Sequence, residues 1–134
     1  GGLRDLGLLR GEVDGLLDQG ANMLFFPHGI GHMVGLGVRD VGPDLPRLPA
    51  DPRRPPVTLR IDLTLAPGDT VTIEPGVYFI PALLDDRERR ERFADSVDWS
   101  KVDALKRFGG IRLEDNAHVT PAGPENLTSA IPML

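Results

Sequence analysis

The sequence contains no cysteine among its 134 residues, and this absence limits both its covalent and its metal chemistry. Disulfide bonds and thiolate ligands are excluded, so any bound metal would take nitrogen and oxygen donors. A chain without cysteine fits a reducing compartment, and we expect a cytoplasmic location.

Long apolar runs and an excess of positive charge are also absent. No apolar stretch reaches the length needed to cross a bilayer, and no basic–apolar–small pattern opens the chain. The net charge is −5, whereas nucleic acids and anionic membranes attract positively charged proteins. We therefore expect neither of these partners. The length allows one domain at most, and a composition of 40% hydrophobic and 26% charged residues is typical of a globular protein.

Helical patterns occur in three parts of the chain. Apolar residues at helical spacing before Gly20 predict two short helices around a glycine turn. The mixed-sign charge run over residues 85–92 is typical of a solvated helix or loop. Residues 97–108, which include the only tryptophan, predict an amphipathic helix that a glycine pair ends.

Strand patterns occur in four segments: residues 23–26, 34–38, 70–74 and 111–120. The third segment alternates polar and apolar residues, which puts Thr72 and Glu74 on one face of a strand. The fourth puts Arg112 and Glu114 on one face in the same way. Together with the helices, these patterns predict an α+β protein.

Proline dominates one segment of the chain. Six prolines fall between residues 43 and 56 with a period of about three, which is typical of polyproline II. The segment is interpreted either as a loop bridging two strands or as a ligand for a proline-recognising module. The turn-rich tail from residue 121 onward is expected to pack on the surface.

Three segments place ionisable residues among glycines, prolines and β-formers: Pro27–His32, Thr72–Gly76 and Gly110–Asp115. One imidazole nitrogen and two carboxylates can hold a divalent cation and leave positions open for water. The glycines on either side of Ile30 suit backbone that passes close to something bulky, such as a metal and its ligands.

Each segment also has a plainer interpretation. His28 and His32 would be ordinary hydrogen-bonded histidines, and Glu74 would be a solvated carboxylate at a strand end. Arg112 and Glu114 would form a surface ion pair. The three segments form a metal site only if the fold brings them together.

The stretches PHGIGHMVGLGVRDVG, VTIEPGVYF and GGIRLEDNAHVT resemble, in order and spacing, the signature segments of the pita-bread metallopeptidases. This family includes methionine aminopeptidase, aminopeptidase P, prolidase and creatinase, and the insertion over residues 80–107 looks most like prolidase. The resemblance covers nearly the whole chain. It implies part of a pita-bread fold, with a curved, mainly antiparallel sheet flanked by helices.

The resemblance implies a metal centre. His32 corresponds to the histidine ligand, Glu74 to a glutamate ligand of the same metal, and Glu114 to the glutamate that bridges two metals. We expect these three side chains to converge in one coordination shell. The expected metal is Mn, with Co, Zn and Fe as alternatives, because ligand type alone does not select one of them.

The resemblance also implies residues around the substrate, a dipeptide with a C-terminal proline. His28 corresponds to a histidine beside the substrate, Arg112 supports the ligands, and Tyr78 matches a tyrosine that lines the site. Arg60 stands where prolidases hold the dipeptide's carboxylate, a task that suits the forked guanidinium group. Arg39 replaces the family's usual catalytic histidine, and its permanent charge cannot exchange a proton near neutral pH.

The chain departs from the family in a second way, since the two upstream aspartate ligands have no equivalent here. We therefore expect residues 1–134 to be the C-terminal portion of a prolidase-like catalytic domain, inactive in isolation. The alternatives are one half of a split enzyme and a non-catalytic family member that serves as a protein-binding scaffold. An incomplete domain would expose strand edges and apolar surface, so we expect a homo-oligomer or a complex with the missing N-terminal half.

Overall fold

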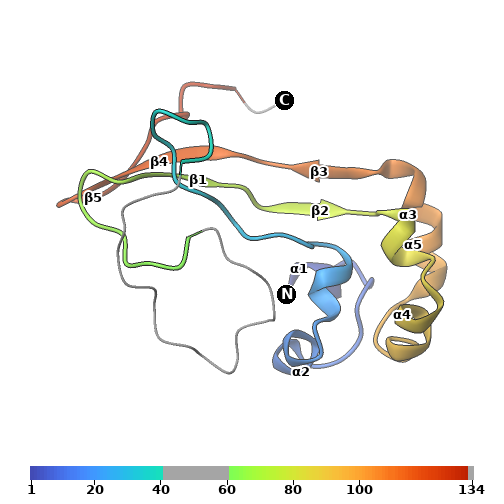
Figure 1. Cartoon of the computed structure of the whole chain (residues 1–134). Helices are drawn as coiled ribbons and strands as arrows, with labels where there is room; N and C mark the ends of the chain where they lie inside the picture. The colour runs from blue at the N-terminus through green and yellow to red at the C-terminus, as the bar shows by residue number, and fades with distance from the viewer. Residues whose placement is uncertain (41–60, 133–134) are drawn as a thin grey trace. The chain divides into compact units, whose positions relative to one another are not determined.

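The computed structural model describes residues 1–40 and 61–132, and the chain divides into two compact units. The first unit contains Gly1–Pro27 and Gly76–Ile111, and the second contains His28–Pro75 and Arg112–Leu134. Each unit is therefore assembled from two separate stretches of the chain, as the colours of Figure 1 show. The helices and antiparallel strands confirm the α+β class.

The first unit contains most of the helices. Its elements are α1 (Gly2–Asp5), α2 (Val13–Asp18), η1 (Ala21–Leu24), β2 (Gly76–Tyr78), α3 (Pro81–Leu84), α4 (Arg87–Arg92), α5 (Trp99–Leu105) and η2 (Lys106–Phe108). Strand β2 pairs with β3 (Gly110–Arg112), which ends at the boundary of the unit. The two short helices predicted before Gly20 are confirmed as α1 and α2.

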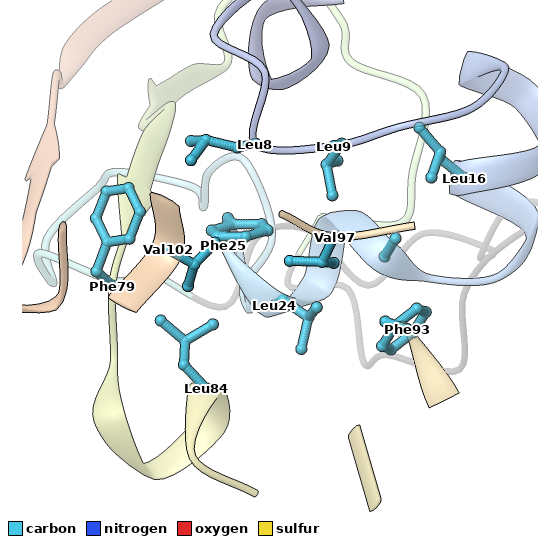
Figure 2. Packing of buried hydrophobic residues seen from close by; sticks show 11 residues of the cluster. Leu8, Leu9, Leu16, Leu24, Phe25, Phe79, Leu84, Phe93, Val97 and Val102 are labelled. Atoms are coloured by element: carbon cyan, nitrogen blue, oxygen red, sulfur yellow. The ribbon is translucent and has the colours of Figure 1, made fainter. Parts of the chain in front are cut away.

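Leucine, phenylalanine and valine side chains from both stretches of the first unit form one hydrophobic core. The largest fully buried side chains are those of Phe25, Leu84, Val97 and Val102. Figure 2 shows Phe25 between Val102 and Val97, with Phe79 and Leu84 nearby. Phe79 is buried among them and meets the Phe25 ring edge-on. Removal of this apolar surface from water is the main force that holds the unit together.

The strand predicted over residues 23–26 is wrong, because the chain forms the 3₁₀ helix η1 there instead. Gly20 adopts a left-handed conformation with φ 77°, which turns the chain directly after α2. The amides of Phe25 and Phe26 then bond locally to the carbonyl of Asn22. The apolar run is thus buried by a turn, and a four-residue run does not distinguish these outcomes.

The helix predicted over residues 97–108 is confirmed in outline. It begins at Asp98, whose carboxylate accepts a hydrogen bond from the Lys101 amide at 3.1 Å, and continues as α5 and η2. The chain leaves η2 at Gly109, where φ is 80°. The charge run over residues 85–92 contains the exposed helix α4, as predicted.

The lowered pKa values of two aspartates in this unit indicate that acid destabilises the fold. The Lys101 amide and the Arg10 guanidinium lower the pKa of Asp98, and hydrogen bonds from Lys106 and Arg90 lower that of Asp103. A carboxylate with a lower pKa in the folded state stabilises the fold above its unfolded pKa, and this contribution is lost as pH falls through the folded value.

We therefore expect the free energy of unfolding to fall once the pH drops below about 4. Urea unfolding at a series of pH values measures this. The double variant Asp98→Asn with Asp103→Asn should show a shallower acid slope than the unchanged chain. An identical slope in both proteins would contradict the assignment.

The second unit contains a three-stranded antiparallel sheet. Strands β1 (Thr70–Ile73), β4 (Asp115–Thr120) and β5 (Gly123–Asn126) lie in the order β1-β4-β5 (Figure 1). In the register of β1 and β4, Val71 is opposite Ala117. Met33, Val71 and Ala117 form its small buried cluster. The tail expected to be turn-rich contributes β5, which turns back from β4 at Gly123 with φ 125°.

Two strand predictions in this unit need correction. Residues 34–38 do not form a strand: residues 35–37 form bends and residues 38–39 a turn, enclosed by an isolated bridge between Met33 and Asp40. The strand predicted over residues 111–120 is split into β3 and β4. The break lies beside Pro75, whose carbonyl accepts from the Leu113 amide and which has no N–H to continue a ladder.

The proline segment of residues 43–56 lies outside the described residues. Within the described ranges, no helix is long and apolar enough to span a membrane.

Candidate metal and active site

The site begins with a pairing between two segments about forty residues apart in sequence. Residues 30–34 run antiparallel to β1: the Glu74 amide bonds to the Ile30 carbonyl at 2.6 Å, and the Thr72 amide to the His32 carbonyl at 2.9 Å. Directly opposed residues in an antiparallel pair project their side chains to the same face. His32 is therefore opposite Thr72 and diagonal to Glu74.

Gly31 is required by this pairing. A Cβ atom at this position would lie 2.0 Å from the Thr72 carbonyl oxygen. The close approach expected for the glycines therefore involves the backbone of β1. Gly29 differs, since a Cβ there would meet no atom within 4 Å.

We expect Gly31→Ala to destabilise the fold by about 1–3 kcal/mol, because the strand backbone must shift to make room for a methyl group. Thermal and urea unfolding measure the loss. Gly29→Ala is the matched control and should have a much smaller effect, since it adds the same methyl group into open space. Equal effects of the two substitutions would contradict the close approach.

His32 and Glu74 form a buried pair at the centre of the site. The two residues are 6% and 4% exposed, and His32 Nε2 lies 3.1 Å from Glu74 Oε1. His32 Nδ1 donates to the Met33 carbonyl at 2.9 Å, because a carbonyl oxygen only accepts. In the neutral imidazole, Nε2 therefore directs a lone pair toward a carboxylate oxygen, and a cation or a proton is needed between these two acceptors.

The carboxylate of Glu74 has two further partners. Thr72 Oγ1 donates to Oε1 at 2.7 Å, and Arg112 Nη1 lies 3.2 Å from Oε2. Burial raises the pKa of Glu74, but the Thr72 hydrogen bond and the charges of Arg112, His32 and Arg39 outweigh it, so the pKa is lowered. Glu74 is therefore held as a carboxylate, the form that binds metal ions.

Arg112 connects Glu74 to Glu114. Its Nη2 lies 3.5 Å from Glu114 Oε2, while its Nη1 contacts Glu74. The Glu114 side chain is 45% exposed, in contrast to the buried pair. The structure thus brings His32 and Glu74 together and connects Glu114 to them through an arginine.

The remaining predicted site residues lie in different surroundings. His28 is half-buried, and its Nδ1 donates to the Gly29 carbonyl at 2.7 Å. Arg39 is exposed, although its charge acts on Glu74 as described above. Tyr78 belongs to the first unit, where its ring contacts Gly76 and Gly110, and an added Cβ at either glycine would collide with it. Arg60 lies outside the described residues. The roles of these residues in substrate binding stay predictions.

The described residues fit part of a metal centre. A histidine that donates its Nδ1 proton to a carbonyl and directs Nε2 toward a buried carboxylate has the arrangement of a metal ligand, and the carboxylate suits the same cation. Among the residues that the structure describes, no three His, Cys, Asp or Glu side chains are grouped closely enough to hold a metal ion. The structure therefore brings together two of the three predicted ligands, His32 and Glu74, and the ligand roles of these two residues and of Glu114 stay predictions.

Comparison with known proteins assigns the family. Residues 5–121 match the sequence model of metallopeptidase family M24, and the chain therefore belongs to this family. The match includes the pair described above, as well as Arg112 at the end of β3 and Glu114 in the break before β4.

Two groups of relatives agree with this assignment. An Xaa-Pro dipeptidase of Xanthomonas axonopodis pv. citri is 42% identical over 96% of this chain, and one of Shewanella baltica is 44% identical over 94%. A variant of Escherichia coli aminopeptidase P has a TM-score of 0.65 and 34% identity over 99% of this chain. The chain thus has part of the pita-bread fold, and it spans 30% of the Xanthomonas protein and 23% of the E. coli chain.

Thr72 is the residue that the sequence did not single out. Its place beside Glu74 on one strand face was predictable from alternation alone. Its bond to the backbone of His32 was not, because nothing local in sequence connects residues forty positions apart.

Proposed function

We propose that this chain forms the C-terminal portion of the catalytic domain of a metal-dependent Xaa-Pro dipeptidase. The enzyme would hydrolyse the amide bond before a C-terminal proline. The observation that carries the proposal is the buried pair of His32 and Glu74, whose Nε2 and Oε1 atoms lie 3.1 Å apart in segments typical of metal ligands. The relatives named Xaa-Pro dipeptidase, which match nearly the whole chain, support the substrate class.

The residues of the chain would have separate roles at the metal site. His32 would bind the metal through Nε2, with its ring held by the Met33 carbonyl, and Glu74 would bind through Oε1. Arg112 contacts the carboxylates of Glu74 and Glu114 and limits their movement. A divalent cation, Mn in first place, would polarise the substrate carbonyl and activate water.

The proposal requires donors from outside this sequence. His32, Glu74 and the bridging Glu114 would leave the second metal of the pair held by Glu114 alone, whereas catalytic sites commonly use three protein ligands and water. Aspartates from a preceding segment of the same protein, or from a second chain, would complete the centre. We propose that the isolated 134-residue chain does not hydrolyse the dipeptide.

A chimeric enzyme tests the proposed function. This chain would replace the matching 30% of the Xanthomonas axonopodis relative, with the unchanged relative as the positive control. We expect the chimera to hydrolyse Xaa-Pro dipeptides in the presence of Mn²⁺. A folded chimera that binds Mn²⁺ or Co²⁺ but cleaves no dipeptide would contradict the enzyme and favour the non-catalytic scaffold.

Arg60 provides a sharper prediction about the substrate. Loss of a charge-assisted contact to the dipeptide carboxylate costs about 1.5–3 kcal/mol, so Arg60→Ala in the chimera should lower kcat/KM for dipeptides roughly 10- to 150-fold. Substrates with a blocked carboxyl group should lose little. An equal loss with both substrates would remove Arg60 from carboxylate recognition. Arg39→His, measured beside it, reports whether a titratable group at that position speeds the reaction.

A further inference from the structure

Thr72 is a buried residue of β1 whose hydroxyl group makes two directed hydrogen bonds. It is 4% exposed, accepts from the His32 amide at 3.0 Å and donates to Glu74 Oε1 at 2.7 Å. A hydroxyl group carries a single proton, and here that proton is committed to the glutamate. The donor and acceptor functions therefore connect one proposed ligand to the backbone of the other.

The bonds of Thr72 act at the point where the two ligands face each other. The Glu74 oxygen that accepts the threonine proton is the same Oε1 that lies 3.1 Å from His32 Nε2. The Thr72 amide also donates to the His32 carbonyl, so both the N–H and the C=O group of His32 bond to Thr72. A β-branched side chain has restricted χ1 freedom, which holds the hydroxyl in place between them.

We propose that Thr72 is a positioning residue that sets the distance and orientation of Glu74 relative to His32 for metal binding. This inference rests on the proposed function, in which both residues are metal ligands. Without the hydroxyl group, Glu74 Oε1 loses its hydrogen-bond donor, and Arg112 remains as a partner of the carboxylate. The His32 amide loses its acceptor as well. The carboxylate is then expected to rotate toward Arg112 and away from the imidazole.

Three variants of the chimera, in which the rest of the relative supplies the remaining ligands, isolate this effect. Thr72→Val keeps the shape of the side chain and removes both hydrogen bonds, whereas Thr72→Ser keeps the hydroxyl and removes a methyl group. Thr70→Val is the matched control: Thr70 lies two positions earlier on β1, and its side chain makes no hydrogen bond within the described part of the chain. Circular dichroism verifies that each variant folds.

Two measurements are made on each protein. Crystal structures without metal give the position of the Glu74 carboxylate, and titration with Co²⁺, followed by its absorption spectrum, gives the metal affinity. We expect Thr72→Val to displace the carboxylate and to weaken Co²⁺ binding roughly 10- to 100-fold. Thr72→Ser and Thr70→Val should stay close to the unchanged chimera in both respects.

An undisplaced Glu74 or an unchanged affinity in Thr72→Val overturns the inference. So does an equal loss in Thr70→Val, because the effect would then belong to the strand as a whole. The absence of Co²⁺ binding to the unchanged chimera overturns it as well, because Thr72 would then have no metal site to position. The proposed function is decided separately, by dipeptide hydrolysis in the chimera, so the two failures are distinguishable.

Discussion

Glu74→Gln is expected to lower the kcat/KM of the chimera for Xaa-Pro dipeptides roughly 1,000-fold, since a catalytic metal contributes several kcal/mol and each 1.36 kcal/mol is a factor of ten. The substitution keeps the size of a side chain that is 4% exposed and removes its negative charge. Its amide oxygen is a weaker ligand, and Arg112 and His32 lose the carboxylate that they contact at 3.2 and 3.1 Å. Steady-state kinetics and the bound metal content measure the result.

Glu125→Gln is the matched control for this prediction. Glu125 lies on β5 in the same unit, and its side chain is 65% exposed. Within the described residues, its only ion-pair contact is with His118 Nδ1, at 3.5 Å. We expect full activity and full metal content in this variant. Retention of both by Glu74→Gln would show that Glu74 is not a metal ligand.

Phe25→Ala should lower the free energy of unfolding by about 3–5 kcal/mol, a large part of the 5–15 kcal/mol that stabilises a typical domain. The Phe25 side chain is fully buried and meets the Phe79 ring edge-on at 5.9 Å. Its removal leaves a cavity in the core of the first unit, in addition to the loss of buried apolar surface. Urea unfolding of the chain measures the change.

Phe108→Ala separates burial from ring contact. Phe108 also meets Phe79 edge-on, at 6.2 Å, but it is 59% exposed. Its substitution should cost no more than about 1.5 kcal/mol, the upper value for an aromatic pair. If the two phenylalanines proved equally costly, the core described here would not be the main source of stability.

Local features of the fold were predictable because their causes are local. The helices α1 and α2, the exposed helix α4 and the helix begun at Asp98 follow from periodicity, charge and glycine positions. Alternation along β1 also predicted that Thr72 and Glu74 share a face, and their 2.7 Å hydrogen bond confirms it. The burial of this polar face was not predictable, because alternation does not show which face of a strand is covered. Ile73, on the opposite and apolar face, is 44% exposed.

Two strands predicted from local sequence patterns, over residues 23–26 and 111–120, were wrong or only partly correct. Residues 23–26 carry a strand-like run, yet they are buried by the turn of η1. The strand predicted over residues 111–120 breaks where Pro75 interrupts the neighbouring ladder. In the first case local hydrogen bonds to the Asn22 carbonyl form a turn, which a short apolar run does not distinguish from a strand. In the second case Pro75, a partner distant in sequence, decided the conformation, and tertiary context overrides weak local preference.

The sequence by itself determined the chemistry of the site and its family: nitrogen and oxygen donors without thiolates, and His32, Glu74 and Glu114 in segments typical of a metallopeptidase. Only the tertiary structure decided which donors meet. His32 and Glu74 face each other because residues 30–34 pair with β1, and Gly31 permits that approach. Glu114 instead contacts Arg112, which in turn contacts Glu74. Ligand types depend on side-chain chemistry, but their distances depend on strand register, which is set by hydrogen bonds between segments far apart in the chain.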